Sequence, residues 1–179
     1  MNMSPNWYER PMRIAALQCN FEEGRTLEVV DTWVDSGFNV EQLFHPMAES
    51  YTAVFDTALH GELLTRYLAK AHARGLRIIL YQNVHLINPS QAGHHDEWAI
   101  RDRAGKFPML YGTYYGCCLN SPWRDHFFGV LETLAPYEID GLFLDGPAGI
   151  AGGCFCPSCR ARYRHEYGCE MDTAKNLDD

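Results

Sequence analysis

The sequence contains no uninterrupted apolar run that approaches membrane-spanning length. Its N-terminus lacks a basic region followed by an apolar stretch, so we expect no signal peptide. Basic residues are scarce: Lys and Arg number 15, against 23 Asp and Glu, and the net charge is −8. Because binding to nucleic acid requires a basic surface, we do not expect nucleic acid as a partner. Because no apolar run is long enough to span a membrane, we expect no membrane partner either.

The composition is that of a globular protein, with 46% hydrophobic and 21% charged residues. A length of 179 residues is enough for one domain with a hydrophobic core. The seven cysteines are an odd number and are clustered. This pattern fits metal binding in a reducing compartment better than a disulfide framework. We therefore expect a single domain, residues 1–179, in the cytoplasm.

Short apolar runs bounded by turn residues predict β-strands at residues 13–19, 38–44, 76–82 and 139–145. Amphipathic segments between and after them predict helices over residues 26–36, 59–74, 121–135 and 157–167. We expect Thr26 and Ser121 to cap the first and third of these helices. Residues 83–120 are predicted to be a long irregular stretch, which in a compact domain is usually functional.

The alternation of strands with helices predicts an α/β fold. An open doubly wound sheet has this order, and so does half of an eight-stranded barrel; long loops at the strand ends favour the barrel. We therefore expect a partial (β/α)8 TIM barrel of about four β/α units with parallel strands. Half a barrel leaves open sheet edges. Either the natural chain continues past Asp179, which we favour, or two copies close one barrel as a homo-oligomer.

The strand predicted at residues 139–145 ends in a carboxylate. Its apolar run, Leu142 to Leu144, indicates a strand buried on both faces, and Gly146 ends it. Parallel sheets and barrels place their chemistry at the carboxyl ends of strands. Asp145 is therefore either a catalytic group or a structural cap, and we favour catalysis.

Residues 154–159 read CFCPSC, a C-x-C-x-x-C motif. Tight turns bring such thiolates around one soft cation, and zinc takes four ligands in tetrahedral geometry. Cys154, Cys156 and Cys159 would supply three ligands, so a fourth must come from elsewhere. The alternative is three free or partly disulfide-bonded cysteines.

Several polar residues lie at or just beyond the ends of the predicted strands. The carboxyl ends of parallel strands meet at one edge, so we expect these residues to line a sugar pocket and bind hydroxyl groups: Gln18, Asn20, His45, Gln82 and His85. Capping of loops is the alternative for them. Trp98 and Tyr115 would stack on a sugar face, although aromatic side chains also pack in cores.

Three stretches resemble one known family. They are GCCLNSP at residues 116–122, DGLFLDGP at residues 140–147 and the cysteine motif. The chain resembles hypothetical glycosyl hydrolase 6 over roughly residues 12–168, with the cysteine motif as the most specific part. The resemblance implies a TIM-barrel glycoside hydrolase with a carbohydrate substrate, and makes this chain the N-terminal half of the barrel.

A more distant resemblance is to glycoside hydrolase family 42, the β-galactosidases. Members carry a Cys shortly before Asn-Ser-Pro and a C-x-C-x-x-C motif, which together bind a structural zinc. The resemblance implies that Cys118 is the fourth ligand, with Cys117 as the alternative. Family 42 has Asn-Glu where this chain has Leu144 and Asp145, so its acid/base does not carry over. Amylase-like and fucosidase-like barrels resemble the chain in placing an Asp nucleophile on strand four.

The leading hypothesis is hydrolysis of a glycosidic bond, with Asp145 as a catalytic carboxylate and zinc as a structural cofactor. Four thiolates leave no open coordination position, so the metal would not be the catalyst. The second carboxylate would lie on a later strand. Two alternatives stay open: a non-catalytic carbohydrate-binding or assembly half barrel, and a zinc-dependent hydrolase that uses His85 or His94 with Asp145.

Overall fold

The structure is a computed structural model of the 179-residue chain, and it describes residues 6–18, 23–44, 57–88, 95–146 and 151–171. By their internal contacts the residues form two compact units. The first, here the sheet unit, lies within residues 1–49, 55–82 and 133–143. The second, here the cysteine unit, lies within residues 50–54, 83–132 and 144–179.

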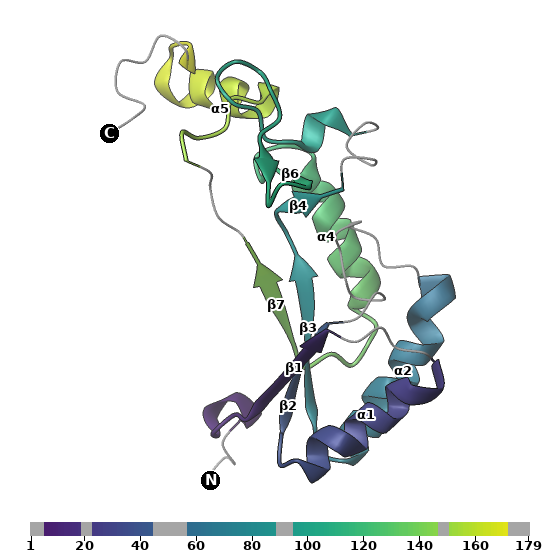
Figure 1. Cartoon of the computed structure of the whole chain (residues 1–179). Helices are drawn as coiled ribbons and strands as arrows, with labels where there is room; N and C mark the ends of the chain where they lie inside the picture. The colour runs from purple at the N-terminus through teal and green to yellow at the C-terminus, as the bar shows by residue number, and fades with distance from the viewer. Residues whose placement is uncertain (1–5, 19–22, 45–56, 89–94, 147–150, 172–179) are drawn as a thin grey trace. The chain divides into compact units, whose positions relative to one another are not determined.

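Four strands form a parallel sheet in the order β1-β2-β3-β7 (Figure 1). They are β1 (Ile14–Gln18), β2 (Val40–Phe44), β3 (Arg77–Asn83) and β7 (Gly141–Asp145). The pairs β1–β2 and β2–β3 are parallel. Along β3, the Asp140 N–H donates to the Ile78 carbonyl at 3.0 Å and the Val84 N–H to the Asp145 carbonyl at 3.1 Å. These two bonds show that β7 runs in the same direction as β3.

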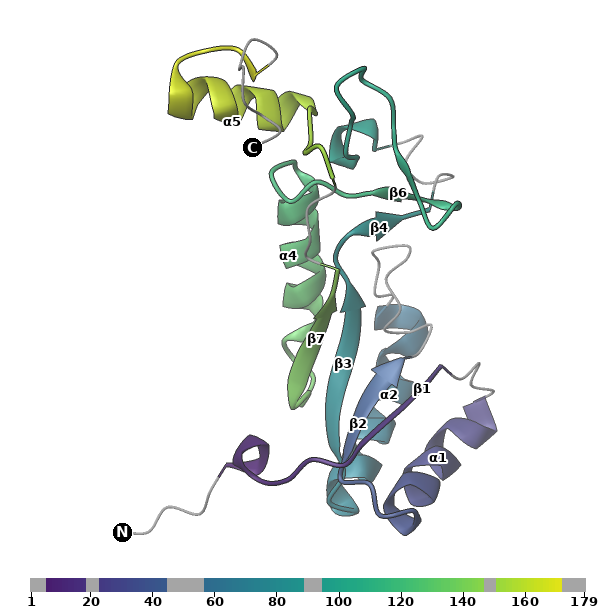
Figure 2. The ribbon, with the colours of Figure 1, turned by 60° about the vertical axis from the view of Figure 1, so that its left-hand side comes forward.

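Helices α1 (Glu23–Asp35) and α2 (Thr57–Ala73) lie beside each other against this sheet (Figures 1 and 2). Helix α1 begins before its predicted start, so Thr26 lies inside the helix and is not its cap. Gly37 and Gly75 follow the helices with φ of 85° and 76°, a left-handed conformation that favours glycine. The buried apolar residues of the unit include Val30, Val40, Leu43, Leu64, Tyr67, Leu68, Ala71, Leu76, Ile78 and Leu80.

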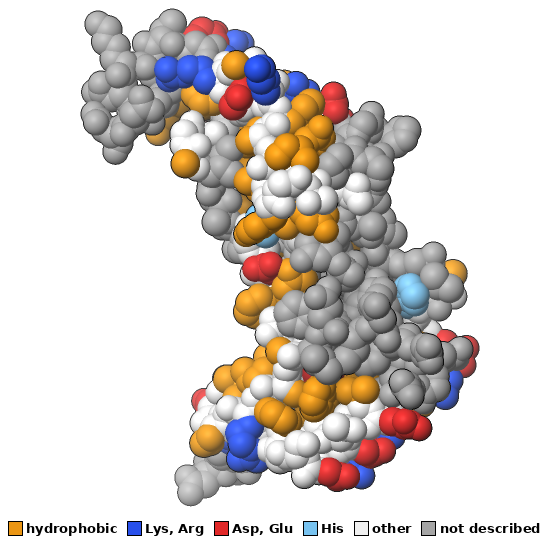
Figure 3. Space-filling model, viewed as in Figure 1, with side chains coloured by type: hydrophobic (Ala, Val, Ile, Leu, Met, Phe, Trp, Pro, Cys, Tyr) orange, Lys and Arg blue, Asp and Glu red, His pale blue; other side chains and the backbone are white. Residues whose placement is uncertain are grey.

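The strand β7 is exposed, and the prediction of a strand buried on both faces is wrong. Leu142, Phe143 and Leu144 are 44%, 44% and 43% exposed. The physical reason is position: β7 ends the sheet order, and no strand among the described residues pairs with its outer edge. On the face drawn in Figure 3, hydrophobic side chains are also gathered at the surface over β1 and β2, whereas charged side chains gather over α1.

One acidic side chain is buried between β2 and α2. Glu41 is 1% exposed, and it accepts a hydrogen bond from the Tyr67 hydroxyl. Burial raises the pKa of Glu41, because the charged form loses its hydration, and the bond from Tyr67 offsets only part of this. The core of the sheet unit therefore favours the neutral carboxyl group.

A second carboxylate ties the amino ends of β3 and β7 together. Asp140 accepts hydrogen bonds of 2.8 Å from the Ile78 N–H, from Arg77 and from His72. Its side chain is 8% exposed, and burial alone would raise its pKa. The Ile78 N–H, His72 and Arg77 outweigh burial and lower the pKa of Asp140. Asp140 thus anchors the start of β7 to the start of β3.

The cysteine unit contains a small antiparallel sheet in the order β4-β6-β5. Its strands are β4 (Leu86–Ile87), β5 (Met109–Leu110) and β6 (Tyr114–Gly116), and they lie inside the stretch predicted to be irregular. Helix α4 (Trp123–Leu134) begins as predicted after Ser121, whose hydroxyl accepts from the Trp123 N–H at 3.2 Å. Helix α5 (Pro157–Tyr167) has its predicted bounds.

The order β1-α1-β2-α2-β3-α4-β7-α5 confirms the α/β class with parallel strands alternating with helices. Two short 3-10 helices, η1 (Trp7–Glu9) and η2 (Asp96–Trp98), complete the described elements. Among the helices that the structure describes, none has the length and apolar character needed to cross a membrane.

Candidate functional site

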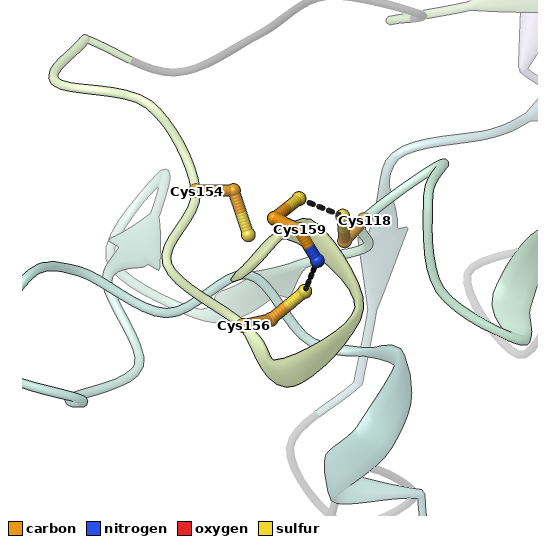
Figure 4. A group of neighbouring side chains, drawn as sticks. All are labelled: Cys118, Cys154, Cys156 and Cys159. Atoms are coloured by element: carbon orange, nitrogen blue, oxygen red, sulfur yellow. Dashed lines mark hydrogen bonds between the residues drawn. The ribbon is translucent and has the colours of Figure 1, made fainter. Parts of the chain in front are cut away.

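Four cysteines of the cysteine unit meet in one cluster (Figure 4). Their Sγ atoms all lie within 4.8 Å of one another, and those of Cys118 and Cys159 are 3.4 Å apart. Three of the four are buried and Cys154 is half-buried. The cluster joins the end of the small sheet, at Cys118, to the loop and first turn of α5.

The local sequence explains this convergence. Cys156 is the N-cap of α5, and Pro157 occupies the first helical position, where its missing N–H costs nothing. The Cys159 N–H donates to Cys156 Sγ at 3.5 Å, so the cap places two of the thiols one turn apart. On the other side, the Cys118 N–H donates to the Trp98 carbonyl at 2.8 Å.

Cys117 and Cys118 are neighbours in sequence but belong to different environments. Cys117 is packed in an apolar cluster with Val84, Trp98 and Trp123, and burial raises its pKa. Cys118 is packed with the other cysteines. Consecutive residues of an extended chain point to opposite sides. The geometry therefore selects Cys118 over Cys117 as the fourth member of the cluster.

The four sulfurs have the chemistry and spacing of a zinc site. In a tetrahedral site with Zn–S bonds of about 2.3 Å, ligand sulfurs lie about 3.8 Å apart. In the structure, the Sγ atoms of Cys118 and Cys159 lie 3.4 Å apart and all four Sγ atoms lie within 4.8 Å of one another, which is compatible with this value. Hydrogen bonding among the thiols divides them: with Cys118 as donor it lowers the pKa of Cys154 and lowers that of Cys156 to about 7, whereas the pKa values of Cys118 and Cys159 are raised. Two of the four thiols are thus shifted toward the thiolate form that binds metals.

One residue outside the motif contacts the cluster and a second one orients it, and the motif spacing gave no sign of either. The Asn120 amide donates to Cys159 Sγ at 3.4 Å, and Arg162 donates to Asn120 Oδ1 at 2.7 Å. The closeness of Asn120 to Cys118 in the sequence was the one available signal.

Asp145 lies half-buried at the carboxyl end of β7, as predicted. Its carbonyl oxygen accepts from the Val84 N–H, and His85 Nδ1 lies 3.2 Å from the same oxygen. A Cβ atom at Gly146 would lie 1.9 Å from His85 Nδ1, and Gly146 has a φ of 72°. Only glycine fits there, so the backbone that carries Asp145 is held closely against His85.

The aromatic candidates lie in packed surroundings. Trp98 is 8% exposed, and its ring is stacked with those of His95 and His126. Tyr115 is half-buried and stacked on Phe107, with ring centroids 5.0 Å apart. A different aromatic residue, Tyr111, is 78% exposed, and its ring lies edge-on to that of His85 at 6.3 Å.

The remaining predicted site residues are placed only in part. Gln18 is the last residue of β1, and Gln82 lies buried near the end of β3. Both therefore lie toward the carboxyl ends of parallel strands. Asn20, His45 and His94 fall outside the described residues.

Comparison with known proteins gives the family. The sequence model of the family described as hypothetical glycosyl hydrolase 6 matches residues 30–146, more than half of the chain. The chain belongs to this family. This match confirms the resemblance to the family that was predicted from the sequence. Among curated proteins, no sequence matches significantly.

Solved structures of glycosidases share the fold. The chain is similar to alpha-L-fucosidase isoenzyme 2 from Paenibacillus thiaminolyticus, with a TM-score of 0.70 and 20% identity over 94% of this chain and 28% of that one. It is similar to a beta-galactosidase from Marinomonas ef1, with a TM-score of 0.64 and 17% identity over 87% and 25%. The chain is also similar to the alpha-galactosidase TtGalA from Thermus thermophilus, with a TM-score of 0.60 and 17% identity over 75% of this chain and 30% of that one.

The chain spans less than a third of the length of each of these structures. Four parallel β/α units that match part of a glycosidase barrel confirm the predicted fold, a partial (β/α)8 TIM barrel.

Proposed function

We propose that the protein acts as a glycoside hydrolase and that Asp145 is a catalytic carboxylate. Membership of the hypothetical glycosyl hydrolase 6 family supports the reaction class. The observation that carries the residue assignment is the position of Asp145 at the carboxyl end of a parallel strand, next to a glycine that leaves no room for a side chain. A carbohydrate is the substrate class that follows.

Asp145 would serve as nucleophile or as stabiliser of the transition state, which requires an ionised carboxylate. Its backbone is suited to this task, because bonds from Val84 and His85 to its carbonyl fix the strand end. A second carboxylate is needed, and we place it on a later strand of a complete barrel. For sugar binding we propose the residues predicted from the sequence: Gln18, Asn20, His45, Gln82, His85, Trp98 and Tyr115.

The exposed apolar strand β7 supports the proposal that this chain is half of a barrel. Leu142, Phe143 and Leu144 would be covered if a further strand paired with β7. We favour further β/α units on a longer chain, as in the longer solved structures. Pairing of two copies of the chain, as a homo-oligomer, is the alternative, and the mass of the complete protein in solution distinguishes the two.

We also propose that Cys118, Cys154, Cys156 and Cys159 hold one structural zinc, for which the sulfur spacing is suitable. With four thiolates the zinc would supply no catalytic water, so its role would be structural: it would hold Cys118 against the first turn of α5. Elemental analysis tests this directly: one zinc per chain is expected, and its absence would exclude the site. The absence of disulfides among the described cysteines supports a reducing, cytoplasmic location. The net charge of −8 supports our proposal that nucleic acid is not a partner.

The test of the catalytic proposal uses the complete protein and aryl glycosides of α-L-fucose, α-galactose and β-galactose, the sugars named for the similar structures. Asp145→Asn should leave the fold intact and lower turnover by at least about 100-fold, because it removes covalent and electrostatic stabilisation together. Asp125→Asn, on the exposed first turn of α4, is the matched control. Unchanged turnover in a folded Asp145→Asn variant would make Asp145 a strand-end cap.

A further inference from the structure

The side chain of Asn120 is directed at one ligand sulfur. Its Nδ2 donates to Cys159 Sγ at 3.4 Å. Asn120 belongs to the turn between Cys118 and α4. The segment that supplies Cys118 to the cluster therefore also supplies a hydrogen bond to Cys159. The contact therefore joins the two halves of the cysteine cluster without passing through the metal position.

Arg162 fixes the orientation of this amide. Its Nη1 donates to Asn120 Oδ1 at 2.7 Å, and its Nε donates to Glu166 at 2.7 Å. Because a guanidinium group can only donate, its contact with Oδ1 leaves Nδ2 as the atom that faces Cys159. Glu166 and Arg162 lie four residues apart on α5, where side chains share one face.

We propose that Asn120, oriented by Arg162, is a positioning residue of the metal centre that stabilises the Cys159 thiolate and strengthens the hold on zinc. This inference rests on the proposed zinc site. Four thiolates around a divalent cation carry a net charge of about −2, which N–H donors to sulfur offset. The bond from the Cys159 N–H to Cys156 Sγ persists in variants of Asn120 and Arg162. The bond from Asn120 is the one that a substitution removes.

The sharpest variant is Asn120→Asp, which has nearly the same shape and can still accept from Arg162 but cannot donate to sulfur. Zinc affinity is measured on the zinc-loaded protein by competition with a chromophoric chelator. Loss of an outer hydrogen bond typically weakens metal binding by about 10–100-fold. We expect zinc affinity to fall about tenfold in Asn120→Ala, the low end of this range, because Asn120 is solvent-exposed. We expect a larger fall in Asn120→Asp, which also adds a negative charge beside the thiolates.

Arg162→Ala should weaken zinc binding by a smaller factor, and its effect should largely disappear in the Asn120→Ala background, because both act through one contact. Arg164→Ala is the matched control: Arg164 is on the same helix and bonds Glu170 instead. Its zinc affinity should equal that of the wild type. A cobalt-substituted sample adds a second readout, since loss of an N–H bond to sulfur should shift the sulfur-to-cobalt charge-transfer band of Asn120→Ala.

Zinc affinities of both Asn120 variants within about twofold of the wild type, with an unshifted cobalt band, would overturn the inference while one zinc per chain remained bound. Additive effects of Asn120→Ala and Arg162→Ala would overturn the link between these two residues. Absence of zinc from the wild type is a different result, which would overturn the proposed metal site itself.

Discussion

Helices α2 and α5 both follow strands of the parallel sheet, but they are held in place differently. In α2, Leu64, Tyr67, Leu68 and Ala71 are at most 2% exposed. In α5, Cys159 is the one buried residue. Burial of apolar surface contributes about 25 cal/mol per Å². The buried apolar surface of α2 suffices to anchor that helix, whereas α5 buries little apolar surface. We therefore attribute the placement of α5 to the cysteine cluster.

The contrast extends to the cores around the two helices. The sheet unit contains buried Leu, Ile and Val side chains on its strands and on both of its helices. Around the cysteine cluster the described apolar side chains are few: Ile100 is buried beside Cys118, Cys156 and Cys159, Phe155 is buried between two of the cysteines in sequence, and Met171 is partly buried. With so little apolar volume around the thiols, the proposed zinc would stabilise them through metal–sulfur bonds rather than through burial. Loss of the metal should thus release α5 and leave the sheet unit folded.

The largest expected effect comes from removing one ligand. Cys156→Ser should bind no zinc and lose the helical structure of α5, because structural zinc binding contributes about 10–16 kcal/mol in small domains. Metal content and far-UV circular dichroism measure the two losses. Cys117→Ala is the control, and it should keep one zinc because Cys117 lies outside the cluster. A Cys156→Ser variant that still binds zinc and keeps α5 helical would contradict the claim that the cysteine cluster holds α5 in place.

Next in size is a core substitution in α2. Leu64→Ala should lower the free energy of unfolding by about 2–5 kcal/mol, since the side chain is fully buried, and should leave the zinc content unchanged. Urea denaturation measures the loss. The neighbouring Leu63 is only half-buried, so Leu63→Ala should cost less. Loss of zinc in Leu64→Ala would show that the two regions depend on each other.

A smaller effect is expected at the polar anchor of the sheet. Asp140→Asn should lower the free energy of unfolding by about 1.5–3 kcal/mol at pH 7, because it weakens charge-assisted hydrogen bonds to a buried carboxylate. The folded-state pKa of Asp140 lies below its ordinary value of 3.8. The wild type should therefore keep this advantage above pH 3.8 and lose it as the pH falls through the folded-state pKa.

Denaturation of both proteins between pH 2 and 7 tests this prediction. Asp35→Asn, which removes an exposed partner of Arg74, should change little at any pH. A difference between wild type and Asp140→Asn that grows in acid would contradict the lowered pKa.

The smallest effect concerns Glu41, whose pKa is raised by burial above the ordinary value of 4.5. Its contribution to stability is complete below pH 4.5 and is lost as the pH rises through the folded-state pKa. At pH 8, Glu41→Gln should be as stable as the wild type or more stable by up to about 1 kcal/mol, because its amide oxygen still accepts from Tyr67. Thermal unfolding at pH 4 and pH 8 measures this, and a variant clearly less stable at pH 8 would contradict it.

The sequence allowed most of the parallel sheet to be predicted, because its apolar runs and glycine stops are strong signals. The bounds of α5 followed from Pro157 and Gly168, which begin and end the helix. The exposure of β7 could not be predicted, since an apolar pattern says which residues favour burial but not whether a neighbouring strand is present. The small antiparallel sheet was missed because strands of two or three residues show no periodicity.

The cysteine cluster was predicted in two steps of different strength. Motif spacing indicated three ligands, whereas Cys118 came from family resemblance, because spacing cannot choose between adjacent cysteines. The contact of Asn120 with Cys159 depends on the turn that joins β6 to α4, and no sequence rule places it. The roles of Asp145 and the sugar-binding residues stay predictions.

Hydrogen exchange before and after removal of zinc with a chelator tests the central claim most directly, since it reads both regions in one sample. The account predicts that amides of α5 and of residues 116–121 lose protection, while those of β2, β3 and α2 keep theirs. Equal loss of protection in both regions, or none in α5, would contradict the claim that a metal holds one region and apolar burial the other.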